Sequence, residues 1–201
     1  MKAQTALTPC FPIRLKYGNT NTYLIGNLLV DTDMAGTLTS FGREVKKHGI
    51  SPDQIKYVLV THFHPDHMGL VGKFMQKGIK LILLEHQTAY VHSSDAIYNR
   101  NPRTDFMPID EKNAIVISVK ESRSFLSNIG IAGEIIITKS HSPDGAALIL
   151  DDGTAFVGDL EPREFIDGYR DNTPLREDWE NLLSHGVKII HYGHANDGQI
   201  P

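Results

Sequence analysis

The stretch from Thr61 to His67 carries three imidazoles and one carboxylate within six positions. Neutral imidazole and ionised carboxylate are ligands that zinc, iron and manganese accept. In an extended segment alternate side chains leave the same face, so His62 and His64 can hold one ion. A proline then ends the extended segment, and Asp66 and His67 can face a second ion. A histidine-rich surface loop is the alternative, but four ligand-type residues at this spacing favour a metal site.

Further ligand-type residues follow other predicted strands. Short strand-forming runs at 57–60, 135–138, 156–158 and 187–190 are followed, in that order, by His62 with His64, by His141, by Asp159 and by His194. If these strands run in one direction, the loops after them meet at one rim of the sheets, where α/β proteins tend to bind ligands. Taken singly, His141 could be an ordinary loop histidine and Asp159 a strand-end cap.

Two histidines near the end of the sequence compete for the last ligand position. His191 ends the predicted strand 187–190, whereas His194 follows Gly193, which lets the backbone approach closely. We favour His194, because a loop residue reaches a site at the rim more easily. The other histidines fall on predicted helices or their ends and are typical of surface or capping residues: His48, His86, His92 and His185.

The elements that must position these residues mix strands and helices. Strands are predicted at 12–17, 22–25, 28–30, 57–60, 80–84, 115–119, 134–138, 146–150, 155–157 and 187–190, with hairpin turns at Gly26-Asn27 and Asp152-Gly153. Helices are predicted at 37–48, 68–77, 87–98 and 174–185, while 121–129 is ambiguous and 99–111 and 161–173 are irregular. Two sheets with helices on their outer faces satisfy this order, which indicates an α/β or α+β protein.

Length and composition narrow the class of protein. A chain of 201 residues with 40% hydrophobic residues fits a single domain over 1–201. A net charge of −4 gives no basic surface for nucleic acid or membranes, and no stretch reaches the roughly 18 apolar residues of a spanning helix. The start of the chain does not resemble a signal peptide, so we expect a cytoplasmic protein. Cys10 is the sole cysteine, which leaves nitrogen and oxygen ligands for a metal.

The sequence THFHPDH at 61–67 matches the HxHxDH signature of the metallo-β-lactamase superfamily. His141, Asp159 and the Gly193-His194 pair resemble the later ligands of that family in order and approximate spacing. The segments 21–25 and 29–32 also look like its opening strands. The resemblance spans nearly the whole chain and implies a four-layer αββα sandwich with a metal centre, usually binuclear, at one edge.

The family's ligand set can be carried over residue by residue. The resemblance implies that one ion is held by His62, His64 and His141, the other by Asp66, His67 and His194, and that Asp159 bridges the two. It also implies two divalent ions, for which zinc is the first expectation and iron or manganese the alternatives.

Differences between branches of the family narrow the expected activity. The β-lactamases proper lack an aspartate at the position of Asp159 and are usually secreted, and the di-iron flavoproteins have glutamate at the position of His64. The nucleic-acid-processing branches usually carry an inserted domain or a basic arm, and glyoxalase II has a helical domain after its last histidine. Residues 140–145 read SHSPDG and depart from the PGHTPGH run of the glyoxalase II-like branch.

What remains is a compact binuclear hydrolase that cleaves an ester, thioester, lactone or phosphodiester in a small molecule. The resemblance implies attack by a hydroxide that bridges the metals, and Asp66 would orient this nucleophile or carry a proton to the leaving group. A mononuclear iron persulfide dioxygenase of the same superfamily is one alternative, and a non-catalytic metal-binding module is another. The sequence leaves the natural substrate and the formation of a homo-oligomer open.

Overall fold

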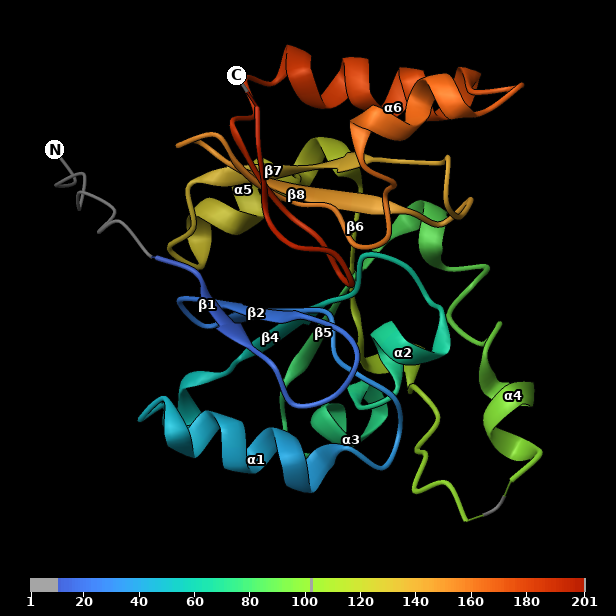
Figure 1. Ribbon diagram of the computed structural model, residues 1–201. Coiled ribbons are helices and arrows are strands. Elements are labelled where there is room, and N and C mark those ends of the chain that lie inside the picture. Colours follow the sequence, from blue (N-terminus) through green and yellow to red (C-terminus); the bar gives the residue numbers. More distant parts are fainter. Residues whose placement is uncertain (1–10, 102, 201) are drawn as a thin grey trace, which may run out of the picture.

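Two β-sheets stack face to face in the computed structural model, which describes residues 11–101 and 103–200 (Figure 1). Helices lie on the outer sides of the pair, so the chain is a mixed α/β protein with the layering of an αββα sandwich. This confirms the expected fold class. Cys10 lies outside the described residues. None of the described helices is long and apolar enough to cross a membrane.

The first sheet has six described strands, in the order of the sequence. They are β1 (Ile13–Leu15), β2 (Thr22–Ile25), β3 (Leu28–Val30), β4 (Tyr57–Leu59), β5 (Lys80–Leu84) and β6 (Ile115–Ile117). The predicted hairpin over Gly26-Asn27 is confirmed, with Tyr23 opposite Val30 in antiparallel register. From β3 to β6 the strands are parallel, so β3 and β4 deliver the residues that follow them to the same edge.

The second sheet has five described strands in the order β11-β10-β9-β8-β7. They are β7 (Gly133–Ile137), β8 (Ala146–Leu150), β9 (Thr154–Phe156), β10 (Ile189–His191) and β11 (Gly198–Gln199). The Asp-Gly hairpin between β8 and β9 is confirmed. Because β8 is antiparallel to both β7 and β9, and β9 is parallel to β10, the strands β7, β9 and β10 run in one direction. Their following loops therefore leave one edge of this sheet, as predicted.

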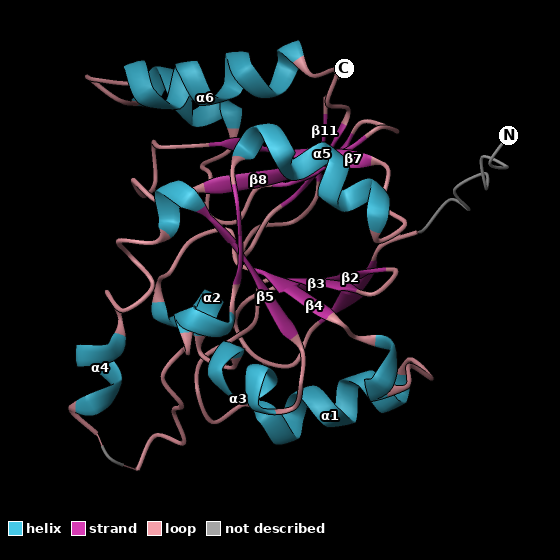
Figure 2. Ribbon diagram, turned by 180° about the vertical axis from the view of Figure 1, so that it is seen from behind, coloured by secondary structure: helices cyan, strands magenta, loops and turns pink. Residues whose placement is uncertain are grey.

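The core consists of apolar layers between and outside the sheets. The inner layer packs side chains such as Leu28 and Leu59 of the first sheet against Leu148 and Phe156 of the second. Helices α1 (Leu38–Lys47) and α3 (Val71–Gln76) cover the outer face of the first sheet, and α6 (Thr173–Ser184) covers that of the second (Figure 2). Trp179 of α6 is 1% exposed, and burial of side chains of this size is the main stabilising term.

Several predicted element boundaries are wrong. The helix expected at 68–77 is two short helices, α2 (Pro65–Met68) and α3, separated by a turn at 69–70. A Cβ on Gly69 in this turn would collide with the backbone of Ala35. The helix expected at 87–98 shrinks to α4 (Asp95–Asn99), and the short strand β11 was not foreseen. The ambiguous segment forms most of helix α5 (Val119–Asn128). The Ser118 N–H donates to the Glu121 carboxylate, which caps the first turn of this helix.

Candidate metal centre

The loop after β4 is fixed by buried side chains from three other segments. Asp31, directly after β3, accepts the Thr61 N–H at 2.6 Å, and Asp144 accepts the Phe63 N–H at 2.7 Å. Gln87 donates to the carbonyls of Val60 and Thr61. Each of these carboxylates and amides is itself buried, so the loop that carries the histidines is held by hydrogen bonds that water cannot compete for.

The structure brings all seven predicted ligand residues to one edge of the sandwich. Ligand atoms lie within 4.8 Å of one another in three groups: His62, His64 and His141; His62, His67 and Asp159; and Asp66, His67 and His194. His191 is not in these groups, because its Nδ1 lies 2.9 Å from Asp197 and its ring stacks on Phe156. The choice between the last two histidines therefore falls, by geometry, on His194.

The first group is a cluster of three imidazole nitrogens. His62 Nε2 lies 3.0 Å from His64 Nδ1, which in turn lies 3.2 Å from His141 Nε2. A hydrogen-bonded chain sets the proton on His62. The Thr61 hydroxyl donates to Asp31 Oδ2 at 2.8 Å, so its oxygen accepts from His62 Nδ1 at 3.2 Å. His62 Nε2 then carries the lone pair and faces the other imidazoles, as a metal ligand must.

His67 and Asp159 provide a test of whether a cation fits. His67 Nδ1 is bonded to the Asp31 carboxylate at 2.9 Å. Its Nε2 lies 3.1 Å from Asp159 Oδ1, yet both atoms are buried and form no aligned hydrogen bond with the described residues. Buried polar atoms without partners are costly. A divalent ion beside these two lone pairs satisfies both atoms, so the residues present fit a metal.

The two oxygens of Asp159 face different groups of ligands. Oδ2 lies 3.6 Å from His141 Nε2 and 3.9 Å from His62 Nε2. Oδ1 lies 3.1 Å from His67 Nε2 and 3.5 Å from His194 Nε2. One carboxylate therefore stands between two clusters of imidazole nitrogens, which is the arrangement that a bridging ligand requires.

The outer end of the centre is open to solvent. His194 Nε2 lies 3.0 Å from Asp66 Oδ2, and the side chains of these two residues are 41% and 30% exposed. His67 beside them is fully buried. Oδ2 of Asp66 thus lies beside the imidazole nitrogens of His194 and His67. Its Oδ1 forms no hydrogen bond with the part of the chain that the structure describes. A molecule from solvent can reach this end of the cluster.

The electrostatics of the cluster are dominated by burial and by carboxylates. Burial, followed by the charge of His67, lowers the pKa of His62 to about 2, so this imidazole stays neutral and able to bind a metal. Burial also acts to lower the pKa of His67, but Asp31 and Asp159 outweigh it and raise the value to about 10. Burial acts to raise the pKa of Asp159, but the neighbouring imidazoles, above all His67, outweigh it and lower the pKa of this carboxyl below its usual value. The space around His67 Nε2 therefore favours positive charge.

Two glycines let the ends of β9 and β10 approach the cluster. A Cβ on Gly193 would lie 2.7 Å from Asp159 Oδ1 and 2.8 Å from His67 Cε1. Gly158 has φ of +59°, and a Cβ there would lie 2.4 Å from the Thr61 hydroxyl. Only glycine fits at either place without displacing a ligand residue or its support. The close approach expected of Gly193 is confirmed.

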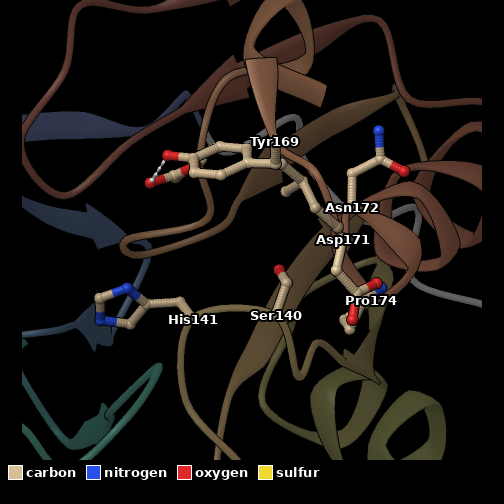
Figure 3. A pocket seen from close by; sticks show the side chains of 8 residues that line it. Ser140, His141, Tyr169, Asp171, Asn172 and Pro174 are labelled. Carbon is tan, nitrogen blue, oxygen red and sulfur yellow. Dashed lines mark hydrogen bonds between the residues drawn. The ribbon is translucent and has the colours of Figure 1, made fainter. Parts of the chain in front are cut away.

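A cavity of about 230 Å³ opens beside His141 (Figure 3). It is lined by Ser140, His141, Glu161, Tyr169, Asp171, Asn172, Pro174 and Leu175. The sequence singled out His141 but none of the others. Four of them (Glu161, Tyr169, Asp171 and Asn172) fall in the stretch 161–173, which shows only irregular polar character. The supporting residues Asp31 and Asp144 were also missed. Asp31 follows a predicted strand, as the ligand residues do, and that position was the available signal.

Comparison with known proteins agrees with this geometry. Residues 15–194 match the family described as the metallo-beta-lactamase superfamily. The beta-lactamase-like protein 2 homolog of Drosophila melanogaster is 26% identical over 93% of this chain, and the chain spans 62% of that protein's length. Among solved structures, a metallo-beta-lactamase family protein of Thermus thermophilus is 22% identical, with a TM-score of 0.64 over 96% of this chain and 75% of the other.

A second solved structure, TTHA1623 in a di-iron-bound form, is 21% identical, with a TM-score of 0.67 over 94% of each chain. At this identity the likeness establishes the fold alone, but the sequence match extends from the first sheet to the last ligand-type histidine. The stacked sheets, the HxHxDH loop and the match over residues 15–194 together lead to one conclusion. The chain belongs to the metallo-beta-lactamase superfamily.

Proposed function

We propose that the protein is a binuclear metal-dependent hydrolase that cleaves an ester, thioester, lactone or phosphodiester in a small molecule. The observation that carries this proposal is the position of Asp159, whose two oxygens face two separate groups of imidazole nitrogens. A structural zinc site is usually closed by four ligands. Seven ligand-type residues, one of them placed where it could bridge two ions, exceed what such a site needs, and the solvent-exposed end leaves room for a substrate.

Each group of ligand-type residues would have its own role in the site. His62, His64 and His141 would hold one ion, Asp66, His67 and His194 the other, and Asp159 both. Divalent ions in such a site supply Lewis acidity and lower the pKa of a bound water toward neutrality. Asp31 accepts from His67 Nδ1 and so keeps the proton of that ring on the nitrogen that faces away from the cluster. Through the Thr61 hydroxyl it does the same for Nδ1 of His62. This leaves the lone pairs of both rings directed inward.

Asp66 has the position of a proton carrier. Its Oδ2 lies on the cluster beside His194, and its Oδ1 makes no hydrogen bond to the described residues. A carboxylate in this position can orient an attacking water, accept its proton and pass the proton to the leaving group. Because Asp66 is partly exposed, the proton can also exchange with solvent.

Elemental analysis of the purified protein tests the proposal. We expect about two zinc, manganese or iron ions per chain, and hydrolysis of at least one member of a panel of thioesters, lactones and phosphodiesters that stops when the ions are removed. One iron per chain with consumption of oxygen would contradict the proposal and favour the dioxygenase. A single tightly held zinc without turnover would contradict it and favour a metal-binding module.

A further inference from the structure

The cavity beside His141 is placed to receive the part of a substrate that does not react. His141 ends at the metal centre on one side and forms the wall of this cavity on the other. The opposite wall comes from segment 161–172 and from the start of α6. In Figure 3, His141 and the Tyr169 ring extend in the same direction from the two walls. A molecule whose scissile bond lies at the cluster therefore has its next few atoms in this space.

The walls of the cavity carry negative charge without a counterion. Glu161 and Asp171 line it, no lysine or arginine does, and neither carboxylate forms an ion pair with the described lysines and arginines. The nearby N-terminus of α6 favours an anion, but Asp171 lies next to that terminus and offsets it. Among the described residues, the carboxylate of Glu161 has only the Tyr169 hydroxyl as a hydrogen-bond partner, at 2.8 Å.

Aromatic and polar groups complete the lining. The Tyr169 side chain is 48% exposed and lies at the cavity, where its ring can contact a bound molecule. The Ser140 hydroxyl is buried and has no hydrogen-bond partner among the described residues. The indole N–H of Trp179 donates to the Glu161 carbonyl at 2.9 Å and fixes the backbone that carries the carboxylate. A carboxylate pair beside an exposed tyrosine ring is suited to an organic cation, which both groups attract.

We propose that this cavity binds an organic ammonium group, so that the substrates are small cationic esters, thioesters or related compounds whose ammonium group lies a few atoms from the scissile bond. Glu161 and Tyr169 then determine specificity. The substrate class rests on the proposed hydrolase function, but occupation of the cavity by a cation does not, and it can be measured without turnover. Anionic substrates are disfavoured by the same carboxylates.

The protein contains a reporter for this cavity. Trp179 is the only tryptophan in the chain, and its N–H is bonded to the carbonyl of Glu161. We would titrate the metal-loaded protein at about 150 mM salt, where charges beyond roughly 8 Å are screened, and follow tryptophan emission. The probes are choline and its uncharged isostere 3,3-dimethyl-1-butanol. We expect a saturable change with choline and a response at least fivefold weaker with the alcohol.

Matched variants identify the group responsible. Glu161→Gln keeps an acceptor for the Tyr169 hydroxyl but removes the charge, and should weaken choline binding about fivefold, as expected for loss of one partly exposed ion pair. Glu164→Gln removes an exposed carboxylate from the same segment that does not line the cavity, and should leave binding unchanged. Tyr169→Leu should also weaken choline binding and leave the metal content intact.

Each outcome decides the proposal. Equal binding of choline and the alcohol, no response to choline, or unchanged binding in Glu161→Gln would overturn it. Metal content and turnover, measured on the same samples, test the proposed hydrolase function separately from cation binding. Choline binding without two ions or hydrolysis would refute only the proposed function. Two ions and hydrolysis without discrimination between the probes would refute only the cation site.

Discussion

Replacement of Asp31 by asparagine tests how the ligand imidazoles are held. Asp31 is 2% exposed, and its carboxylate accepts three hydrogen bonds, from the Thr61 N–H at 2.6 Å, the Thr61 hydroxyl at 2.8 Å and His67 Nδ1 at 2.9 Å. Its φ of +59° lies in the left-handed region, which asparagine tolerates. The Asp31→Asn protein should therefore keep its backbone and lose only the charge and one acceptor oxygen.

The expected loss can be worked out from these bonds. An asparagine oxygen can still accept the Thr61 N–H, but the amide nitrogen cannot accept from the Thr61 hydroxyl or from His67. Two hydrogen bonds to a charged group are lost, at about 1.5 kcal/mol or more each, so we expect about 3 kcal/mol of stability to be lost. For a protein of this length that corresponds to a melting temperature about 6–12 °C lower. Without its orienting partner His67 should bind metal about 10- to 100-fold more weakly.

A second buried carboxylate provides the control. Asp33 is 1% exposed and accepts the N–H groups of Thr20 and Met34, but within the described part of the chain it forms no hydrogen bond or ion pair with a predicted ligand side chain. Asp33→Asn should lower the melting temperature yet change metal affinity less than about threefold. Calorimetry of the metal-free proteins and zinc competition with a chelator give the two quantities. If Asp31→Asn binds zinc as tightly as the wild type, or if Asp33→Asn loses as much affinity, the positioning role assigned to Asp31 is wrong.

Three further predictions concern the centre itself. Asp66→Ala should lower kcat at least about 100-fold while the melting temperature stays within about 2 °C, and near-normal turnover would remove Asp66 from the proton path. Asp159→Ala should reduce the metal content measured by mass spectrometry from about two ions per chain to about one or none, whereas unchanged stoichiometry would argue against bridging. Removal of metal by chelation should lower the melting temperature reversibly, because free zinc about a thousandfold above its Kd adds about 4 kcal/mol; equal melting of the two forms would contradict a site formed only in the folded state.

The parts of the fold that the sequence predicts well are those set by local chemistry. Gly26-Asn27 and Asp152-Gly153 close hairpins because glycine adopts the turn conformation cheaply, and both hairpins are present. The segment 87–98 carries a helical pattern, but the side chains of Gln87 and Ser94 donate to carbonyls of the loop after β4. Such contacts between distant segments outweigh helix propensity, and a single sequence does not reveal them.

The residues of the candidate site also fall into those that the sequence predicts and those that it does not. Ligand-type residues can be picked out because each follows a strand and because histidine and aspartate at that spacing have few other uses. Asp31 also follows a strand, but the sequence does not show which groups its buried carboxylate bonds to. Its role comes from the parallel pairing of β3 with β4, which sets Val30 opposite Leu59 and so places Asp31 beside Thr61. The proposed role of Glu161 and Tyr169 follows only from the cavity that they line together with His141.

The division of ligands between the sheets has a consequence for how the molecule assembles. Every one of the three ligand groups takes two members from residues 62–67 of the first half of the chain and one from the second half. Neither half alone can offer a complete coordination shell, so ions would be captured only after both halves have folded and docked. Bound ions would cross-link the two halves of the chain, so unfolding that separates the halves should be slower when metal is present than when it is absent.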